Sequence, residues 1–424
     1  MRILTSEETP LDWESRKIGY YVEKHKGGAP LKPSDFSESG FPVIPKKAIQ
    51  PGNQLVIKEQ TYCTTQFADE NTRSIVDNSY TITTLRDLVP TGPTIGTVVN
   101  FYTDEQYILS QGVYGLKLKD KISRDYFAYL SNTSLYRNVM RRVMVGSTQV
   151  HIRTPEYLNL EIQTPPLPEQ RKIAKILSTW DKAIATNEKL IATSKQQKKA
   201  LMQQLLTGKK RLVNPETGKA FEGEWEEVKF EDIVLSTQLG TTNRTIDIED
   251  KKTIPLLKMG NLTWGGFNYE KLEELPVSQV EQKLILNEGD FLFNTRNTPE
   301  LVGKSAVWTG GIKQATFDNN INRITFVSTI DPYYLCFYLT NGKGKSKINS
   351  LPAGSTSVAA IYWKDLKNIR LEVPKTNEQQ KIASVLTAAD KEIEVLEAKL
   401  AYFKQEKKAL MQQLLTGKRR VHVE

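Results

Sequence analysis

Cysteine and histidine are scarce in this 424-residue sequence, and each scarcity argues against a class of protein. The two cysteines, Cys63 and Cys336, are far apart, which argues against a disulfide framework and favours a reducing, cytoplasmic environment. The three histidines, His25, His151 and His422, have no partner at the spacing of metal ligands, so we expect no bound metal.

Long apolar runs are missing as well. No stretch approaches the ~18 apolar residues that span a bilayer, and the first residues turn acidic at Glu7 and Glu8 before an apolar segment forms. We therefore expect no transmembrane helix, no signal peptide and no membrane partner. With 39% hydrophobic and 25% charged residues, the composition predicts folded domains rather than disorder.

Complete cofactor or catalytic motifs are also absent. Gly303-Lys304-Ser305 resembles the end of a phosphate-binding loop, but Thr298 stands where that loop needs a glycine. The run from Asp331 to Tyr334 resembles a methyltransferase motif without its second proline, and a helix N-cap followed by proline explains it better. We expect a chain that has no catalytic residues and binds no cofactor.

Positive charge is concentrated in one segment. Of the net charge of +9, the segment 168–211 carries +8, whereas the blocks 1–167 and 212–376 carry +1 and −2. A basic chain of this kind often has only a solvated basic surface. A nucleic-acid surface on either block would have to come from local clusters of cations.

An internal repeat organises the chain. The sequence KKALMQQLLTGK occurs twice, at 198–209 and at 407–418. The blocks before these segments repeat more loosely, with the following matches: Trp13-Glu14 with Trp225-Glu226, Tyr129-Leu130 and Asn132 with Tyr338-Leu339 and Asn341, and Gly146-Ser147-Thr148 with Gly354-Ser355-Thr356. The chain is therefore a duplicated unit of one block and one helix.

Both repeated helices show a 3.5-residue apolar period over about five heptads, as coiled coils do. The first seam contains Ile173, Leu177, Trp180, Ile184, Asn187, Ile191, Ser194, Lys198, Leu201 and Leu205. The second contains Ile382, Leu386, Ala389, Ile393, Leu396, Leu400, Phe403, Lys407, Leu410 and Leu414. We predict an antiparallel pair that acts as a rigid spacer, with a dimer-forming coiled coil as the alternative.

Lys198 and Lys407 occupy the same a-type slot of the two seams. A polar residue at such a slot fixes the register of a coiled coil at some cost in stability. A lysine there can equally extend its ammonium group to the surface. The sequence leaves both possibilities open.

The predicted fold class is α+β, with two mixed α/β domains, a pseudo-twofold repeat and two long antiparallel helices between them. The predicted boundaries are 1–167 for the first domain, 168–208 for the first helix, 209–376 for the second domain, 377–417 for the second helix and 418–424 for a basic tail. Helical patterns are expected near 124–145 and 331–349. The order of the strands does not follow from the sequence.

Cations lead into a small hydroxyl-bearing loop in both blocks, and this pattern suits contacts to DNA phosphates. A solvated helix face followed by a turn is the alternative for either block alone. The candidate DNA-contacting residues are Arg137, Arg141, Arg142, Ser147, Thr148 and Arg153 in the first block, and Arg296, Lys304, Lys343, Lys345, Lys347, Ser355 and Thr356 in the second.

The sequence resembles, over essentially its full length, the specificity subunit of Type I restriction-modification systems. The resemblance is carried by Gly-Ser-Thr-Gln at 146–149, Pro-Pro-Leu-Pro-Glu-Gln at 165–170 before a long helix, and Leu-Leu-Thr-Gly-Lys at 205–209. In the second copy, Ser357 replaces the glutamine and the segment 374–379 replaces the double-proline entry.

The resemblance implies two target recognition domains that bind the two halves of a bipartite, asymmetric site in double-stranded DNA. It implies two modification subunits, which bind S-adenosylmethionine and methylate adenine. It also implies two restriction subunits, which use ATP and Mg for cleavage. This chain would be the non-catalytic, DNA-binding subunit.

Three other interpretations remain. A recognition subunit could work with a nuclease of another restriction type, without translocating partners. A coiled-coil adaptor that only joins proteins would show no sequence-specific DNA binding. A stand-alone enzyme is opposed by the missing motifs.

Overall fold

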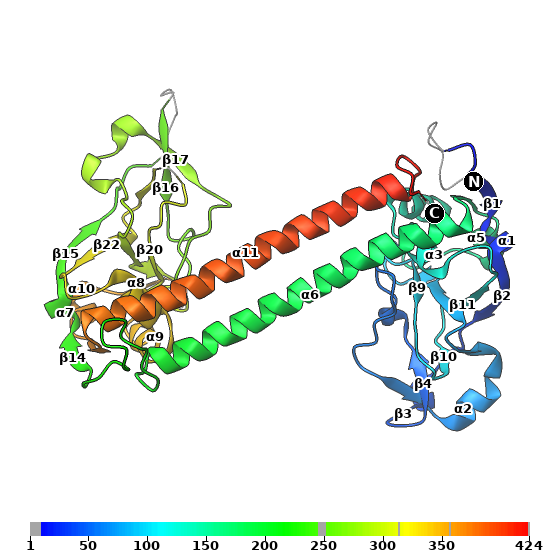
Figure 1. Cartoon of the computed structure of the whole chain (residues 1–424), viewed down its shortest axis with the longest axis horizontal. Coiled ribbons are helices and arrows are strands. Elements are labelled where there is room, and N and C mark those ends of the chain that lie inside the picture. The colour runs from blue at the N-terminus through cyan, green and yellow to red at the C-terminus, as the bar shows by residue number, and fades with distance from the viewer. Residues whose placement is uncertain (1–9, 245–251, 313, 356–357, 423–424) are drawn as a thin grey trace. The chain divides into compact units, whose positions relative to one another are not determined.

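The computed structural model describes residues 10–244, 252–312, 314–355 and 358–422 (Figure 1). The chain divides into two compact units, unit 1 from Met1–Glu188 with Ala398–Glu424, and unit 2 from Lys189–Glu397. The two long helices, α6 (Leu167–Leu205) and α11 (Thr376–Leu414), each contribute residues to both units. The division therefore runs across these helices instead of at their ends.

Unit 1 contains two main sheets, and each is built from short strands. The antiparallel sheet has the order β2 (Val22–Gly27), β11 (Val113–Leu118), β7 (Tyr80–Thr84), β9 (Val98–Asn100). The second sheet has the order β3 (Phe36–Ser37), β5 (Thr61–Cys63), β4 (Phe41–Ile44), β10 (Tyr107–Leu109), β6 (Ile75–Val76), and β4 and β10 are parallel.

The remaining elements of unit 1 are short. Two antiparallel pairs are β1 (Glu14–Lys17) with β13 (Glu161–Thr164), and β8 (Arg86–Asp87) with β12 (Val150–His151). The helices are α1 (Ile18–Tyr21), α2 (Thr65–Glu70), α3 (Arg124–Ser131), α4 (Ser134–Val143) and α5 (Thr154–Leu158), and single 3-10 turns occur at Pro33–Asp35, Lys46–Ala48 and Thr72–Ser74.

Unit 2 repeats this plan. Its antiparallel sheet has the order β15 (Val234–Leu239), β22 (Ile321–Phe326), β18 (Phe291–Asn294), β20 (Ser305–Val307), and the second has the order β17 (Glu273–Pro276), β16 (Thr253–Leu257), β21 (Thr316–Phe317). The small sheets are β14 (Glu226–Lys229) with β25 (Arg370–Val373), and β19 (Arg296–Asn297), β24 (Ala359–Ala360), β23 (Ala353–Gly354). The helices are α7 (Phe230–Ile233), α8 (Pro332–Thr340), α9 (Gly342–Asn349) and α10 (Trp363–Leu366), with 3-10 turns at Val277–Gln279 and Gln282–Leu284.

The caps of the short helices correct one detail of the sequence repeat. Ser123 caps α3 and Asp331 caps α8, and in each case the side chain accepts a hydrogen bond from the third residue of the segment. When the two caps are aligned, Tyr129 of α3 corresponds to Phe337 of α8, because each is the sixth residue after its cap. The match of Tyr129 with Tyr338 made from the sequence was therefore wrong by one residue. The prediction that Asp331 and Pro332 begin a helix is confirmed.

The predicted seams form the contact face of the long helices. All twenty seam positions are buried or half-buried. Within unit 1, Lys404 pairs with Glu188 at 2.8 Å, and Trp180 meets Phe403 edge to face with ring centroids 5.6 Å apart. Within unit 2, Lys195 pairs with Glu397 at 2.6 Å. The pairs advance along one helix as they retreat along the other, so the helices are antiparallel (Figure 1).

The seam lysines are ion-paired and only 19% exposed. In unit 1, Lys407 pairs with Asp181 and its ammonium lies 5.5 Å from the ring centroid of Tyr129, whose hydroxyl donates to Asp181 at 2.6 Å. In unit 2, Lys198 pairs with Asp390 and lies 5.4 Å from the ring centroid of Phe337. Each lysine therefore links the helix pair to α3 or α8, and neither simply extends into solvent.

An arginine forms an ion pair with a glutamate in the first turn of each long helix. In unit 2, Arg211 donates to both carboxylate oxygens of Glu378, at 2.5 and 2.6 Å. In unit 1, Arg420 donates to both oxygens of Glu169, at 2.9 and 2.8 Å, and also to Asp12. The hydrogen bond from Arg420 lowers the pKa of Asp12. The segment predicted as a basic tail thus contains a residue that closes unit 1.

A glutamine beside each glutamate joins the helix start to the block. Gln170 accepts from the Ser123 backbone N–H at 2.9 Å and donates to the Pro165 carbonyl, and Gln379 makes the same two bonds with Asp331 and Pro374. The Glu-Gln motif is therefore a structural attachment point. Among the described residues, no helix combines the length and apolar composition that a bilayer crossing requires.

Replacing Lys407 with Met should destabilise unit 1 by about 1–2 kcal/mol, because Asp181 then keeps a half-buried charge with no cation beside it. For a unit of this size, that loss corresponds to a melting temperature lower by about 2–6 °C. The control is Lys404→Met, which removes an exposed ion pair on the same helix and should change stability by less than about 0.5 kcal/mol. Equal thermal shifts for the two variants would show that the seam position has no special role.

Candidate nucleic-acid interface

The hydroxyl-bearing loop of unit 1 is a tight turn that glycine makes possible. Gly146 has φ +119°, and a Cβ there would lie 2.0 Å from the Gln149 carbonyl oxygen. Backbone hydrogen bonds between Val145 and His151, both 2.9 Å, close the turn. Ser147 and Thr148 are consequently exposed. Their hydroxyls are placed where they can donate to phosphate oxygens.

Three of the predicted arginines lie next to this loop in sequence, and all are exposed. Arg141 and Arg142 lie in the last turn of α4, with Arg141 bonded to Asn138 at 2.9 Å, and Arg153 occupies the N-cap position of α5 without a side-chain capping bond. A fourth arginine was missed by the sequence reasoning. Arg86 on β8 lies opposite His151 on β12, and its guanidinium donates to Gln149 of the loop at 2.7 Å.

Arg137 has a different role from the one predicted. Its guanidinium donates to the carbonyl oxygens of Gly92, Pro93 and Ile95 and to the hydroxyl of Thr97. Burial lowers the pKa of Arg137. Because four donations hold the segment 92–97 in place, this arginine is a structural residue and is removed from the candidate set.

The negative charge of Asp87, which lies beside Arg86 in sequence, is neutralised internally. Burial alone would raise the pKa of Asp87, but hydrogen bonds from Lys46 and Thr94 outweigh it and hold the pKa at about 2. Lys46 lies 2.9 Å from the carboxylate. Asp87 therefore does not offset the loop arginines, and the carboxylate that lies near one of them is the exposed Glu156, 4.0 Å from Arg153.

Unit 2 forms the corresponding turn with one more residue. Gly354 has φ +140°, and the Ser355 backbone N–H donates to the Val358 carbonyl at 2.9 Å. Ser355 is exposed, and Thr356 lies outside the described residues. Ala353 pairs with Ala360 in unit 2 where Val145 pairs with His151 in unit 1, so the sequence of unit 2 has one more residue between the paired positions.

The two interfaces carry different side chains at matching positions. Arg296 on β19 corresponds to Arg86, because both lie opposite the strand that follows the turn. Tyr362, the N-cap of α10, corresponds to Arg153, the N-cap of α5. Tyr362 is 48% exposed and therefore offers an aromatic ring where unit 1 offers a cation.

The basic clusters of the two units do not coincide, which corrects the predicted recurrence. The caps Thr133 and Asn341 match α4 with α9, so Lys345 corresponds to Arg137. Lys345 lies 4.1 Å from the ring centroid of Trp264. Lys343 pairs with Glu372 at 3.3 Å, and Lys347 donates to the Arg370 carbonyl at 2.5 Å. The contacts of both lysines are therefore with β25 instead of the turn.

Lys304 follows a glycine with a structural function. Gly303 has φ +86°, and a Cβ there would lie 2.3 Å from Ile348 of α9. Gly96 in unit 1 has φ +75° and the same closeness to Met140 of α4. Lys304 itself is half-buried, and burial lowers its pKa. The resemblance to a phosphate-binding loop therefore arises from close helix packing.

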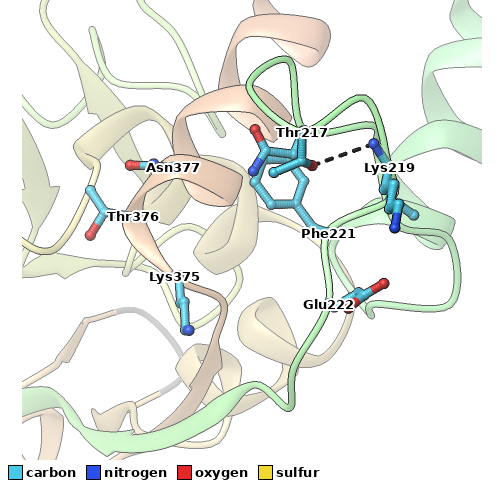
Figure 2. Close-up of a pocket in the computed structure, with 9 residues that line it drawn as sticks. Thr217, Lys219, Phe221, Glu222, Lys375, Thr376 and Asn377 are labelled. Atoms are coloured by element: carbon cyan, nitrogen blue, oxygen red, sulfur yellow. Dashed lines mark hydrogen bonds between the residues drawn. The ribbon is translucent and has the colours of Figure 1, made fainter.

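A pocket of about 700 Å³ lies away from the turn of unit 2, at the start of α11. Figure 2 shows Lys375, Thr376 and Asn377 on one side of it and the segment from Thr217 to Glu222 on the other.

Within the described ranges, no three His, Cys, Asp or Glu side chains gather as a metal site. Cys63 and Cys336 are free and buried, and burial raises the pKa of Cys336 to about 12.

Comparison with known proteins identifies the family. The chain matches the Type I restriction modification DNA specificity domain twice, over residues 10–196 and 222–404, and belongs to that family. The MjaVIII specificity subunit of a Type I restriction enzyme from Methanocaldococcus jannaschii is 28% identical, over 97% of this chain and 94% of the relative. The putative MjaX specificity subunit from the same organism is 26% identical, over 98% and 95%.

A solved structure supports the same fold. The S subunit of a Type I restriction-modification system from M. genitalium aligns with a TM-score of 0.58 at 14% identity, over 99% of both chains. Together with the double family match, this confirms the predicted α+β fold with an internal repeat.

Changing Arg141 and Arg142 to Ala should weaken DNA binding by the assembled methylase for specific and non-specific sequences alike. Each lost phosphate contact should also reduce the slope of log affinity against log salt by about one. The matched control is Lys119→Ala with Lys121→Ala, which removes two exposed charges that lie beside Tyr20. If the arginine variant keeps the wild-type affinity and slope, these two residues do not contact DNA.

Proposed function

We propose that this chain is the sequence-specific DNA-binding subunit of a Type I restriction-modification complex. It directs the complex to a bipartite, asymmetric site for adenine methylation or, with the restriction subunits, for cleavage. The observation that carries the proposal is a loop that begins at a positive-φ glycine in both units, with Arg86 and Arg296 at matching positions opposite the strand that follows it.

The differences between the units support an asymmetric site. Arg153 in unit 1 corresponds to Tyr362 in unit 2, so phosphate attraction on one side is replaced by an aromatic surface on the other. Each unit then recognises its own half-site. The remaining candidate contacts in unit 1 are Arg141, Arg142, Ser147 and Thr148, which are all exposed. In unit 2 they are Lys304, which is half-buried, Lys345, which lies over the ring of Trp264, and the exposed Ser355.

Membership of the family supports the partners that we propose. Two modification subunits bind S-adenosylmethionine and methylate adenine, and two restriction subunits use ATP and Mg. This chain binds none of these cofactors and works in the cytoplasm. Its contribution is recognition of double-stranded DNA, and the flipped adenine enters the pocket of a partner because the chemistry requires it outside the base stack.

The first test exchanges one block. Residues 1–160 are replaced by the same block of a relative with a different target, and the methylated motif is mapped across a genome. We expect one half of the motif to change and the other to stay, because each unit has its own interface. A change in both halves would contradict independent recognition, and a complex that binds no specific sequence would indicate a protein adaptor.

The second test asks whether the helix pair sets the gap between half-sites. Four residues are inserted after Ser194 and four after Glu397, which keeps the Lys195–Glu397 pair in register. At about 1.5 Å per residue the insertion adds about 6 Å, or nearly two base pairs at about 3.4 Å each. An insertion of four locally unwinds a coiled coil without removing its seam.

The expected result of this insertion is a motif with both halves unchanged and a spacer longer by one or two base pairs. The control inserts four residues at Gly218, a turn residue beyond the end of α6 in unit 2. That variant should keep the original spacer. If the helix variant assembles and methylates with the original spacing, the helix pair does not determine the gap.

A further inference from the structure

Asn320 is a polar residue beside the predicted interface of unit 2. It lies in the turn between β21 and β22, beside Thr295, the residue that precedes Arg296. Its carbonyl oxygen accepts from the Thr295 backbone N–H at 2.8 Å, the Thr295 hydroxyl at 3.0 Å and the Asn294 amide at 3.2 Å. Three donors therefore fix the backbone of Asn320 against the residue that precedes Arg296.

The side chain of Asn320 is also held in one orientation. Its amide donates to one oxygen of Asp318 at 3.0 Å, and its backbone N–H donates to the other at 3.1 Å. Asp318 is only 3% exposed, and burial raises its pKa. A buried carboxylate with two donors on it orients the amide firmly, so Asn320 loses little conformational freedom when it binds a ligand.

Half of the Asn320 amide remains available. Within the described part of the chain, its second N–H and its Oδ1 have no protein partner, and the residue is half-exposed. It lines a pocket of about 600 Å³ together with the cations Arg244 and Lys258 and the carboxylates Glu270 and Glu273, of which Glu273 pairs with Lys258. A donor and an acceptor of one rigidly held amide are thus available at a pocket that Arg244 also lines.

Unit 1 has no side chain at this position. The residue that corresponds to Asn320 is Gly112, since Gly112 precedes β11 as Asn320 precedes β22, and each accepts from the residue before the matching arginine. Gly112 has φ +84°, and a Cβ there would lie 3.2 Å from Cβ of Arg86. Asn320 does not share this positive φ, so what the two units have in common is the backbone position beside the residue that precedes the arginine.

We propose that Asn320 is a specificity-determining residue of unit 2, which recognises an adenine in the second half-site by two hydrogen bonds to N6 and N7. An asparagine amide presents the acceptor and donor that these two atoms require, and no other base offers that pair in the major groove. Asp318 is its positioning residue. The inference rests on the proposed function and adds the identity of one base pair.

The test is Asn320→Ala in the reconstituted methylase. Binding is measured on the wild-type site and on sites with each base pair of the second half substituted in turn. We expect discrimination at one A·T pair to fall by about 10- to 100-fold, with the first half-site unaffected. Asp318→Asn should affect the same base pair more weakly. This substitution replaces one carboxylate oxygen with an NH2 group, which cannot accept one of the two hydrogen bonds that Asn320 donates.

The matched control is Asn287→Ala, which removes an exposed asparagine of the same unit and should leave every preference unchanged. Melting curves identify any variant that is misfolded, and Asn320→Gly, which copies unit 1, provides a second route if the alanine variant is unstable. Unchanged discrimination in a folded Asn320 variant would overturn the inference, as would a loss at a G·C pair. A wild-type complex without a sequence preference would instead contradict the proposed function.

Discussion

The rest of each unit depends on one charged contact at the helix seam. A lysine inside a seam must have an anion nearby, because a buried cation alone costs several kcal/mol. In unit 1, that anion, Asp181, also accepts the hydroxyl of Tyr129 on α3, so the same contact attaches the block to the helix pair. In unit 2, Lys198 uses Asp390 and the ring of Phe337. In each unit, these few side chains attach α3 or α8 to the helix pair.

The two units share their backbone contacts and differ in their side chains. The carbonyls of Gly112 and Asn320 make the same bond to the strand beside them, yet only one position carries an amide. Arg137 and Lys345 start at matching positions of α4 and α9, and one holds a loop while the other lies over Trp264. A scaffold specified by main-chain bonds can therefore keep its shape while its contacts to a ligand diverge.

Local signals allowed the long helices to be predicted from the sequence, because a heptad period and a terminal glycine act within a few residues. The helix cap at Asp331 was predictable for the same reason. The strand order was not, since it depends on pairings between distant segments. Matching residues by identity misplaced Tyr129 by one position, and it suggested a recurrent basic cluster that the caps at Thr133 and Asn341 do not support. Asn320 gave no signal, because its importance comes from Asp318 and Thr295 together.

The contact of Arg420 with Glu169 and Asp12 has a consequence for the order in which the two units can complete their folding. Unit 2 is one continuous stretch of chain, whereas unit 1 needs its first 188 residues and the last 27. Domains generally fold as they emerge from the ribosome, starting at the N-terminus. Here the block synthesised first is completed after unit 2, because Glu169 and Trp13 acquire their partners only once residues 417–420 have been made. A nascent chain therefore carries a complete unit 2 and an incomplete unit 1 until the segment through Arg420 has left the ribosome.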